Sequence, residues 1–354
     1  MKKFTTHKLS YYPEKIMRVL AGEIVTPLQC EVSLTSACNF RCPWCVFDYT
    51  KHESNFLDFD SLIHFIDDLA LMKVRSVVYA GTGEPFLYKR INEIISYTAS
   101  KGIKIGITTN GSLIKEHHFE TIVKYCSWIR FSITSFSEEF NKRIYGTNNV
   151  HTKDIFETIK ALCGYKFPQN KDFEIGVQSV LCHPNINEYL AIIGECDFSG
   201  VDYYMLRPFF LNPKNHYTSL SEYLLDKNIK LSIYAAIRAY PVKNVVVLLR
   251  EETERLMYNR SYNLCRALPF IFALEADGNV FNCFPERTGE SEFCIGNIYK
   301  KRLPKIWGGE KHKNFLLNVL PKVDKSKCQP YCRHHPGNEY LEELSNPTEK
   351  IEFP

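Results

Sequence analysis

The sequence has no long apolar run of the kind that crosses a membrane. None of its segments approaches the roughly 18–20 apolar residues that span a bilayer. The N-terminus, from Met1 to His7, starts with a basic stretch but is not followed by the apolar segment of a signal peptide. We therefore expect a protein that has no membrane partner and works in the cytoplasm.

A dominant sign of charge is also missing. The 44 basic and 40 acidic residues are interspersed along 354 positions and leave a net charge of +4. Because no run of lysine and arginine is dense enough to follow a phosphate backbone, we expect no nucleic-acid partner. Hydrophobic residues make up 45% of the chain and charged residues 24%. This composition excludes wholesale disorder, and the length predicts one large domain with a smaller one, or two domains.

Cysteine, in contrast, is abundant, with 13 residues in the chain. An odd number in a long chain without an export signal argues against a disulfide scaffold and favours metal or redox chemistry. Three cysteines are packed between residues 38 and 45, and a second group lies in the last quarter of the chain. Buried cysteine otherwise acts as a small hydrophobic residue, which is the expected role of Cys126, Cys163, Cys182 and Cys196.

Strand and helix patterns alternate between residues 28 and 210. Short β-rich runs predict six strands, at 31–35, 75–79, 104–109, 128–133, 173–181 and 201–206. Apolar residues at helical spacing predict helices at 62–72, 91–100 and 152–165. Asp58 or Asp60 is the expected cap of the first helix, and Gly102 ends the second. Strands separated by helices form a parallel sheet, so we expect an α/β fold with a partial TIM-like (β/α)6 barrel and its chemistry at the carboxyl ends of the strands.

Five parts of the chain are expected from these patterns. They are an N-terminal extension at 1–27, the partial barrel at 28–212, a connecting helical region at 213–258 with a strand candidate at 245–249, a small cysteine-rich domain at 259–344, and a polar tail at 345–354. Short strands at 270–275 and 280–283 are predicted within the cysteine-rich part. They flank Asp277-Gly278-Asn279, which is a hairpin turn signal.

The segment Cys38-Asn39-Phe40-Arg41-Cys42-Pro43-Trp44-Cys45 directly follows the first predicted strand. Three thiolates on a short loop can hold three irons of a [4Fe–4S] cluster and leave the fourth iron open to a chelating small molecule. A structural zinc site wants four protein ligands, and the next candidate, His52, is seven residues further on. Zinc and unligated core cysteines are the alternatives to a cluster.

The spacing Cys-x3-Cys-x2-Cys, with an aromatic residue before the last cysteine, resembles the motif of the radical S-adenosylmethionine (radical SAM) enzyme family. The resemblance covers about residues 28–340. It implies that SAM chelates the open iron through its amino and carboxylate groups. One electron from the reduced cluster then cleaves SAM, and the resulting 5′-deoxyadenosyl radical abstracts a hydrogen atom from the substrate.

A second motif, Ala80-Gly81-Thr82-Gly83-Glu84-Pro85, follows the second predicted strand. Glycines there let a ligand approach the backbone, and a carboxylate can pair with an ammonium group. The turn resembles the family's Gly-Gly-Glu-Pro turn, which holds the amino group of SAM, with Thr82 in place of the first glycine. The resemblance thus assigns Thr82, Gly83 and Glu84 to SAM. It also implies SAM contacts at later positions, namely Asn110, Ser132, Arg143 and Gln178.

A second metal site is predicted from Cys265, Cys283, Cys328 and Cys332. Four thiolates form a complete cluster ligand set, and zinc in a ribbon-like site is the structural alternative. The set resembles the C-terminal twitch extension, a shorter relative of the SPASM domain, in which four cysteines bind one auxiliary [4Fe–4S] cluster. The longer SPASM version has two clusters and would need more cysteines, whereas only Cys294 is left over here.

These features predict a radical SAM oxidoreductase acting on a small polar substrate such as a sugar or cyclitol alcohol. A fully ligated auxiliary cluster can accept the electron that a substrate radical loses when its hydroxyl carbon becomes a ketone, as in twitch-bearing dehydrogenases of the family. Arg207, at the end of the sixth predicted strand, is the expected substrate contact.

Two other activities remain open from the sequence. One is an epimerase that quenches the radical with a thiol, for which Cys294, Cys182 or Cys196 is a candidate donor. The other is a maturase of ribosomal peptides. The resemblance implies flavodoxin or ferredoxin as the low-potential electron donor, and the sequence specifies no oligomeric state.

Overall fold

A computed structural model gives the fold of the chain. It describes residues 8–50, 52–147, 151–170, 172–209, 225–250, 260, 262–283, 291–325, 328, 332 and 334–346. Within these residues, no helix combines the length and the apolarity that crossing a bilayer would require.

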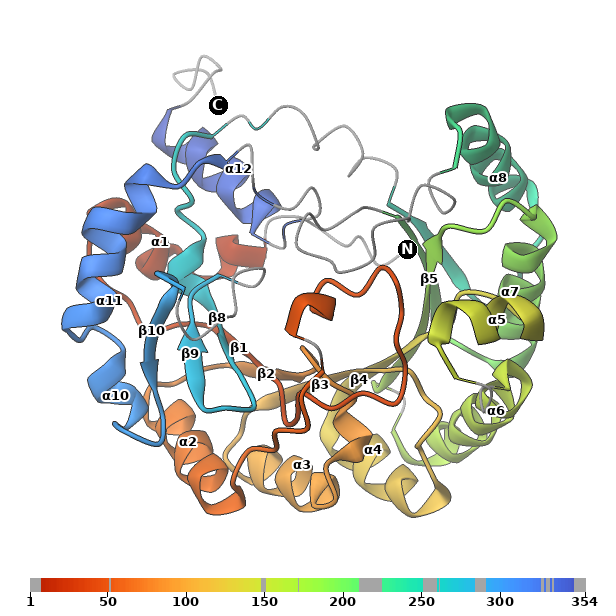
Figure 1. The fold of residues 1–354 in the computed structure, drawn as a ribbon, viewed down its shortest axis with the longest axis horizontal. Coiled ribbons are helices and arrows are strands. Elements are labelled where there is room, and N and C mark those ends of the chain that lie inside the picture. The colour runs from red at the N-terminus through yellow and green to blue at the C-terminus, as the bar shows by residue number, and fades with distance from the viewer. Residues whose placement is uncertain are drawn as a thin grey trace.

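One ten-stranded sheet organises the structure (Figure 1). Its strands are β1 (Gln29–Val32), β2 (Ser76–Tyr79), β3 (Lys104–Thr109), β4 (Cys126–Ser132), β5 (Glu174–Leu181), β6 (Tyr203–Pro208), β7 (Val246–Leu249), β8 (Ile271–Leu274), β9 (Asn279–Phe281) and β10 (Cys294–Asn297). They lie in the order β10-β9-β8-β1-β2-β3-β4-β5-β6-β7. All pairs from β8 to β7 are parallel, and β9 and β10 add an antiparallel edge.

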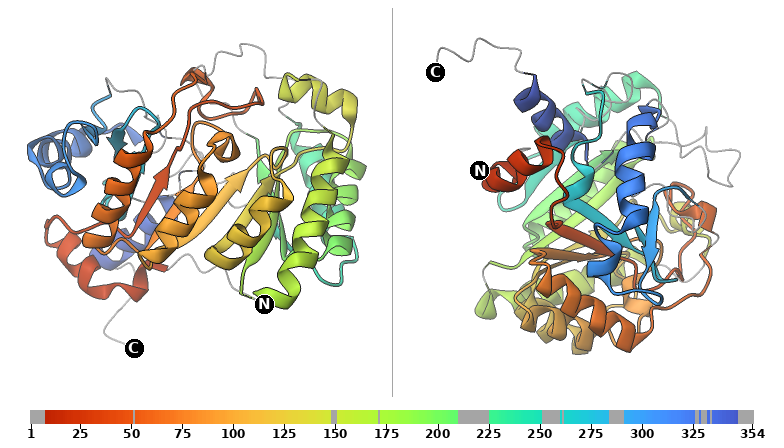
Figure 2. Two further views of the ribbon diagram at one scale, coloured as in Figure 1. Left: turned by 90° about the horizontal axis from the view of Figure 1, so that it is seen from below. Right: turned by 90° about the vertical axis from the view of Figure 1, so that its left-hand side faces the viewer.

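Helices cover the outer face of the parallel strands, as Figures 1 and 2 show. The helices among the described residues are α1 (Pro13–Leu20), α2 (Phe59–Leu71), α3 (Ile91–Ser100), α4 (Phe119–Tyr125), α5 (Glu138–Tyr145), α6 (Thr152–Gln169), α7 (Ile186–Ser199), α8 (Lys227–Ala239), α10 (Leu303–Ile306), α11 (Glu310–Asn314) and α12 (His335–Ser345). In α2, Leu62, Phe65 and Leu69 are buried on one face, and burying each such side chain contributes roughly 1.5–3 kcal/mol.

The predicted barrel is confirmed, and two strands extend it. The six expected strands correspond to β1 through β6, and the strand expected at 245–249 joins β6 as β7. The strand expected at 270–275 is β8, which pairs in parallel with β1. Asp58 is the N-cap of α2, because its carboxylate accepts from Ser61 N at 2.9 Å. The sheet thus runs without a break from the first βα units into the cysteine-rich part.

The two ends of the strands carry different structures. The loop after β1 lies at the carboxyl end, whereas α1 and α12 lie at the amino end (Figure 2). A separate apolar cluster, which includes Ile16, Leu28, Phe270 and Leu341, joins these two helices to the start of the sheet. The carboxyl end is therefore free to hold the polar residues predicted above.

Candidate functional site

The first cysteine loop, Cys38 to Cys45, is tied to the ends of other elements. Arg41 N donates to Tyr145 O at 2.8 Å, and Glu84 N donates to Ala37 O at 2.9 Å. Phe40 stacks on Tyr145 with their ring centroids 4.5 Å apart. Because these contacts come from α5 and from the turn after β2, the loop is held over the carboxyl end of the sheet.

The three thiols of this loop share one environment. Burial raises the pKa of Cys38 to about 11, and the charge of Glu84 adds to the shift. Burial raises the pKa of Cys42 well above its usual value, and Cys38 and Cys45 raise it further. Phe40 N nevertheless donates to Cys38 Sγ at 3.4 Å. A thiol is a weak acceptor, so an N–H aimed at this sulfur suits a thiolate that is bound to metal.

The turn after β2 packs tightly against the first cysteine loop. A Cβ atom on Gly83 would lie 2.3 Å from Thr35 O and 2.4 Å from Ala37 O, which only glycine avoids. Glu84 is buried, and its carboxylate accepts from Thr109 Oγ1 at 2.6 Å and from Asn110 N at 2.8 Å. Burial raises the pKa of Glu84, and these donors oppose the shift. Glu84 therefore joins the turn to the end of β3.

Thr82 stands where the family turn has its first glycine, and its side chain contacts another buried residue. Its side chain is 3% exposed, and its Oγ1 donates to Glu275 Oε2 at 2.8 Å. Its backbone N donates to Ser33 Oγ at 3.2 Å, and its carbonyl contacts His52 Nδ1 at 2.9 Å. Glu275 is 5% exposed and directly follows β8. The hydroxyl that a glycine would lack thus links the turn to the strand between Cys265 and Cys283.

A cavity of about 270 Å³ opens beside the first cysteine loop. Among the predicted site residues it is lined by Cys42, Cys45, Asn110, Ser132, Gln178 and Arg207. Arg207 Nη1 donates to Gln178 Oε1 at 3.4 Å, which joins β6 to β5. We call this space the mouth cavity. It brings residues from five segments of the chain together at the carboxyl end of the sheet, as the barrel interpretation predicts.

Five predicted SAM or substrate residues are not among the described lining of the mouth cavity. Thr82, Gly83 and Glu84 lie in the turn after β2, and Arg143 and Cys294 lie further away in the fold. Arg143 is an exposed residue of α5 whose guanidinium lies 5.3 Å from the centre of the Phe140 ring. Cys294 is buried at the start of β10 and lines a different cavity, together with Lys305 and Lys311. The structure thus places neither side chain on the wall of the mouth cavity.

The sequence analysis missed several residues that the structure brings to the site. Thr134 and Tyr145 line the mouth cavity, as does Gly81 of the second motif, and Glu275 holds Thr82. Glu275 had a signal, because it lies just before the predicted hairpin turn at 277–279. Tyr145 had none, since its position depends on how α5 packs against the loop.

The four C-terminal cysteines meet in one cavity of about 420 Å³. Cys265, Cys283, Cys328 and Cys332 all line it, which confirms that the hairpin and the distant loop come together. Burial raises the pKa of Cys265 to about 12, with a further rise from Cys332. Asn338 Nδ2 donates to Cys265 Sγ at 3.1 Å. This four-cysteine cavity thus repeats the features of the first loop: buried thiols and an N–H that points at sulfur.

The number of cysteines in each site matches the ligand count of a cluster. A zinc ion requires its ligands to converge on one point, with Zn–S bonds of about 2.3 Å. In a [4Fe–4S] cluster each thiolate binds a different iron, so the thiolates stand apart around a central core. Three cysteines in one site and four in the other match an open and a fully ligated cluster.

Sequence comparisons give the same division. The sequence model of the radical SAM superfamily matches residues 32–188. A model described as an iron–sulfur cluster-binding domain, SPASM, matches residues 265–334. The first match contains the three-cysteine loop, and the second contains all four cysteines of the C-terminal cavity.

Similar proteins are found among curated sequences and solved structures. The chain is 26% identical over 327 residues to the tungsten-containing aldehyde ferredoxin oxidoreductase cofactor-modifying protein of Pyrococcus furiosus, with 85% of each chain covered. It is also 26% identical to an S-adenosylmethionine-dependent nucleotide dehydratase of Selenomonas ruminantium, over 46% of this chain and 59% of that one.

Two solved structures share the fold. SuiB of Streptococcus suis bound to S-adenosylmethionine has a TM-score of 0.63 at 15% identity, over 96% of this chain and 80% of that one. The structure of anSMEcpe with bound AdoMet has a TM-score of 0.60 at 15% identity, over 87% and 90% of the two chains.

Proposed function

The chain belongs to the radical SAM superfamily and carries a SPASM-type iron–sulfur domain, and on that premise we propose that it oxidises an alcohol on a small polar molecule. Its cofactors are SAM and [4Fe–4S] clusters. When bound, SAM and a cluster held by Cys38, Cys42 and Cys45 would supply the radical chemistry for hydrogen abstraction. An auxiliary cluster held by Cys265, Cys283, Cys328 and Cys332 would accept the one electron that the substrate gives up, while its proton would go to solvent.

Cys38, Cys42 and Cys45 would hold the first cluster, and the turn at Thr82–Glu84 would position SAM beside it. The backbone of Gly83 is close enough to Ala37 that any ligand held by this turn lies beside the cysteine loop. Ser132 and Asn110 line the same cavity and can donate to the hydroxyl and carboxylate groups of SAM. Arg143 is not on the cavity wall, so a SAM contact from it has no support in this geometry.

Arg207 is the proposed substrate contact, and Gln178, which the resemblance assigns to SAM, lies beside it. Both line the mouth cavity with Cys42 and Cys45, and their side chains contact each other. A planar guanidinium is the side chain best suited to hydroxyl, carboxylate or phosphate oxygens, and its contact with Gln178 holds it at the cavity wall. The Pyrococcus relative, named as modifying a cofactor, is compatible with a small polar substrate.

The observation that carries the oxidation proposal is the meeting of four cysteines in one cavity. Four thiolates leave a [4Fe–4S] cluster without an open iron, so electron transfer is the role that remains for it. A redox-neutral epimerase would instead need a thiol at the mouth cavity. Cys294 lines another cavity, and Cys182 and Cys196 are buried.

The proposal is tested with sugars and cyclitols that carry deuterium on their carbinol carbons. Anaerobic enzyme, SAM and reductant are expected to give deuterated 5′-deoxyadenosine and a product lighter by two hydrogen atoms. A product that keeps its hydroxyl group, is lighter by one mass unit and carries a solvent hydrogen in place of the abstracted deuterium would instead indicate an epimerase. Transfer of deuterium only from a labelled peptide would indicate a maturase, and either result contradicts the proposal.

We expect this reaction to take place in the cytoplasm, because reduced iron–sulfur clusters require a reducing compartment. A flavodoxin or ferredoxin is the expected electron donor. Purified candidates of both kinds should replace dithionite in an assay of 5′-deoxyadenosine formation, and failure of both would remove this part of the proposal.

A further inference from the structure

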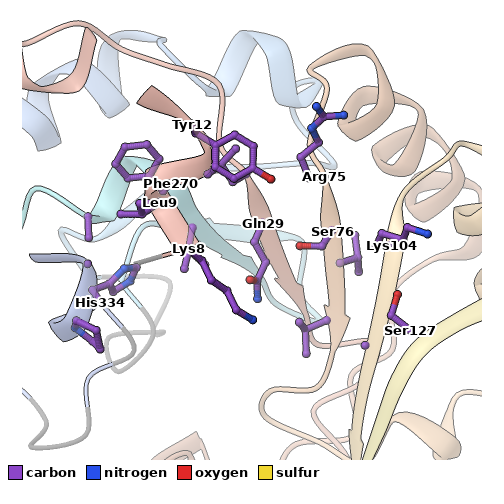
Figure 3. A pocket seen from close by; sticks show the side chains of 18 of the residues that line it. Lys8, Leu9, Tyr12, Gln29, Arg75, Ser76, Lys104, Ser127, Phe270 and His334 are labelled. Carbon is purple, nitrogen blue, oxygen red and sulfur yellow. The ribbon is translucent and has the colours of Figure 1, made fainter. Parts of the chain in front are cut away.

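A second cavity, of about 550 Å³, lies at the amino end of the strands, opposite the mouth cavity. It is lined by the first residues of three parallel strands, Gln29, Ser76 and Lys104, and by the N-terminal segment through Lys8 and Tyr12. Figure 3 shows Lys8 reaching across the opening toward Gln29, with Ser76 beside them and Arg75 and Lys104 along the rim. The reactions proposed above use none of these residues.

The charged residues on the described wall of this cavity are all basic. They are Lys8, Arg75, Lys104 and Arg250, and no Asp or Glu is among the described lining residues. In a chain with 44 basic and 40 acidic residues, this is a local excess. Within the described part of the chain, Lys8, Arg75 and Lys104 form no ion pair with a carboxylate. A site that gathers cations without neutralising them attracts anions.

A neighbouring lysine shows how strongly positive this region is. Lys15 lies on α1, where it donates to Thr26 Oγ1 at 2.7 Å. Burial lowers the pKa of Lys15, and the positive charges of Arg18 and Arg75 lower it further. Lys15 therefore experiences Arg75 as a repelling charge across the start of the sheet, and an anion bound beside Arg75 would relieve that repulsion.

The remaining wall is apolar and partly aromatic. Tyr12, Trp128 and Phe270 line it, and Figure 3 shows Tyr12 and Phe270 side by side near the opening. Ser76, Ser127 and Gln29 add hydrogen-bonding groups between the aromatic wall and the cations. An inorganic ion would use only the basic part of this space. A ligand with a charged end and a planar or apolar body would contact both parts.

From this combination we propose that the amino-end cavity binds a phosphate-bearing small molecule with an aromatic body, of the nucleotide class. Its phosphates would lie among Lys8, Arg75 and Lys104, and its body would lie against Tyr12 and Phe270. The site is separate from the mouth cavity, because the two share no lining residue. Ser76 and Gly81 mark the two ends of the same βα unit, with β2 between them.

The test is calorimetric titration of the holoprotein with ADP, adenosine and pyrophosphate while SAM is held at saturation. ADP is expected to bind at least tenfold more tightly than adenosine, because adenosine lacks the phosphates, and more tightly than pyrophosphate, because pyrophosphate lacks the body. Saturating SAM occupies the mouth cavity, so it should leave ADP binding unchanged. Displacement of ADP by SAM would overturn the proposal, since it would place ADP at the mouth.

Variants of the rim locate the site. The double substitution Arg75→Gln/Lys104→Gln is expected to raise the Kd for ADP at least tenfold. Lys8→Gln, in the short N-terminal segment, should raise it severalfold and serves as the second variant if the double variant is unstable. The matched control is Lys153→Gln, an exposed lysine on the outer helix α6. If Lys153→Gln weakens ADP binding as much as the rim variants do, the attraction is nonspecific and the proposal is wrong.

Discussion

The two cysteine sites of this protein reach similar environments by different routes. The first uses three cysteines of one continuous loop, whereas the second gathers four from segments up to 67 residues apart, from Cys265 to Cys332. Burial raises the pKa of Cys38 in the first site and of Cys265 in the second. In each site an N–H also donates to one sulfur: Phe40 N to Cys38, and Asn338 Nδ2 to Cys265. The difference teaches that a local motif specifies the three-cysteine site, while the four-cysteine site depends on the fold to bring distant segments together.

Removing the continuous loop's ligands is expected to have the largest effect. In Cys38→Ala/Cys42→Ala/Cys45→Ala, iron after anaerobic reconstitution should fall from about eight to about four per chain. Formation of 5′-deoxyadenosine should become undetectable, because no site for the open cluster remains. Cys163→Ala, a buried cysteine of α6, is the control and should keep both values. If the triple variant still cleaves SAM, the loop is not the SAM-cleaving site.

Removing two ligands of the assembled site should separate the two roles. In Cys328→Ala/Cys332→Ala, iron should again fall to about four, but SAM cleavage should persist within about tenfold, because the first loop is intact. Formation of the oxidised product should be lost. Iron analysis, 5′-deoxyadenosine and product mass are the three measurements. Retention of substrate oxidation would show that the C-terminal cluster does not accept the electron.

The contact between Thr82 and Glu275 joins the two regions, and breaking it should have an intermediate effect. Thr82→Val keeps the shape of the side chain but removes the hydrogen bond from Thr82 Oγ1 to the buried Glu275 carboxylate, which costs about 1–3 kcal/mol. We expect the KM for SAM to rise severalfold and the melting temperature to fall by a few degrees. Thr82→Ser retains a hydroxyl and should restore both. Equal behaviour of the Val and Ser variants would show that the hydroxyl does not couple the turn to β8.

The smallest expected effect is a loss of stability in both regions when the pH falls. Burial lowers the pKa of His312 to about 4. His312 contacts Asn282, the neighbour of Cys283 in the four-cysteine cavity. Burial also lowers the pKa of His118, in the barrel, to about 4. The unfolded chain takes up these protons at about pH 6.5, so the contribution of each residue to stability is full above that pH and is lost as the pH falls toward 4. For His312 the loss between pH 7 and pH 5 is about 1–2 kcal/mol.

Hydrogen exchange at pH 7 and pH 5 can locate this loss. Wild-type protein should open more readily at pH 5 in both regions. His312→Asn should remove the pH dependence near β9 and β10 only, and His118→Asn near α4 only. If His312→Asn leaves the change near β9 and β10 as it was, His312 is not its source.

The sequence predicted the parts of the structure that depend on local patterns. The helical spacing of apolar residues predicted α2, and Asp58 was one of the two expected caps. The β-rich runs predicted the strands from β1 to β6. The three-cysteine loop could be interpreted because all its ligands lie in one segment. The pairing of β8 with β1 could not be predicted, since no local feature specifies which edge a distant strand will join.

The same limit applies to individual site residues. Asn110, Ser132, Gln178 and Arg207 line one cavity, because parallel strands present their carboxyl ends at one edge of the sheet. Their contacts with SAM or substrate stay predictions. Cys294 was proposed as a hydrogen donor only because it is a thiol outside the two cluster ligand sets. It lies on the antiparallel edge strand β10 and lines another cavity. Glu275 became visible only when β8 was found beside the turn that holds Thr82.

The central claim is that a cluster bound by Cys38, Cys42 and Cys45 has one iron without a protein ligand. It is tested most directly in the Cys328→Ala/Cys332→Ala variant, where this cluster can be observed without the auxiliary one. The reduced protein is examined by electron paramagnetic resonance before and after addition of SAM. We predict that SAM changes the spectrum of the reduced cluster and is converted to 5′-deoxyadenosine. An unchanged spectrum without 5′-deoxyadenosine, or zinc in place of iron at these three cysteines, would contradict the account.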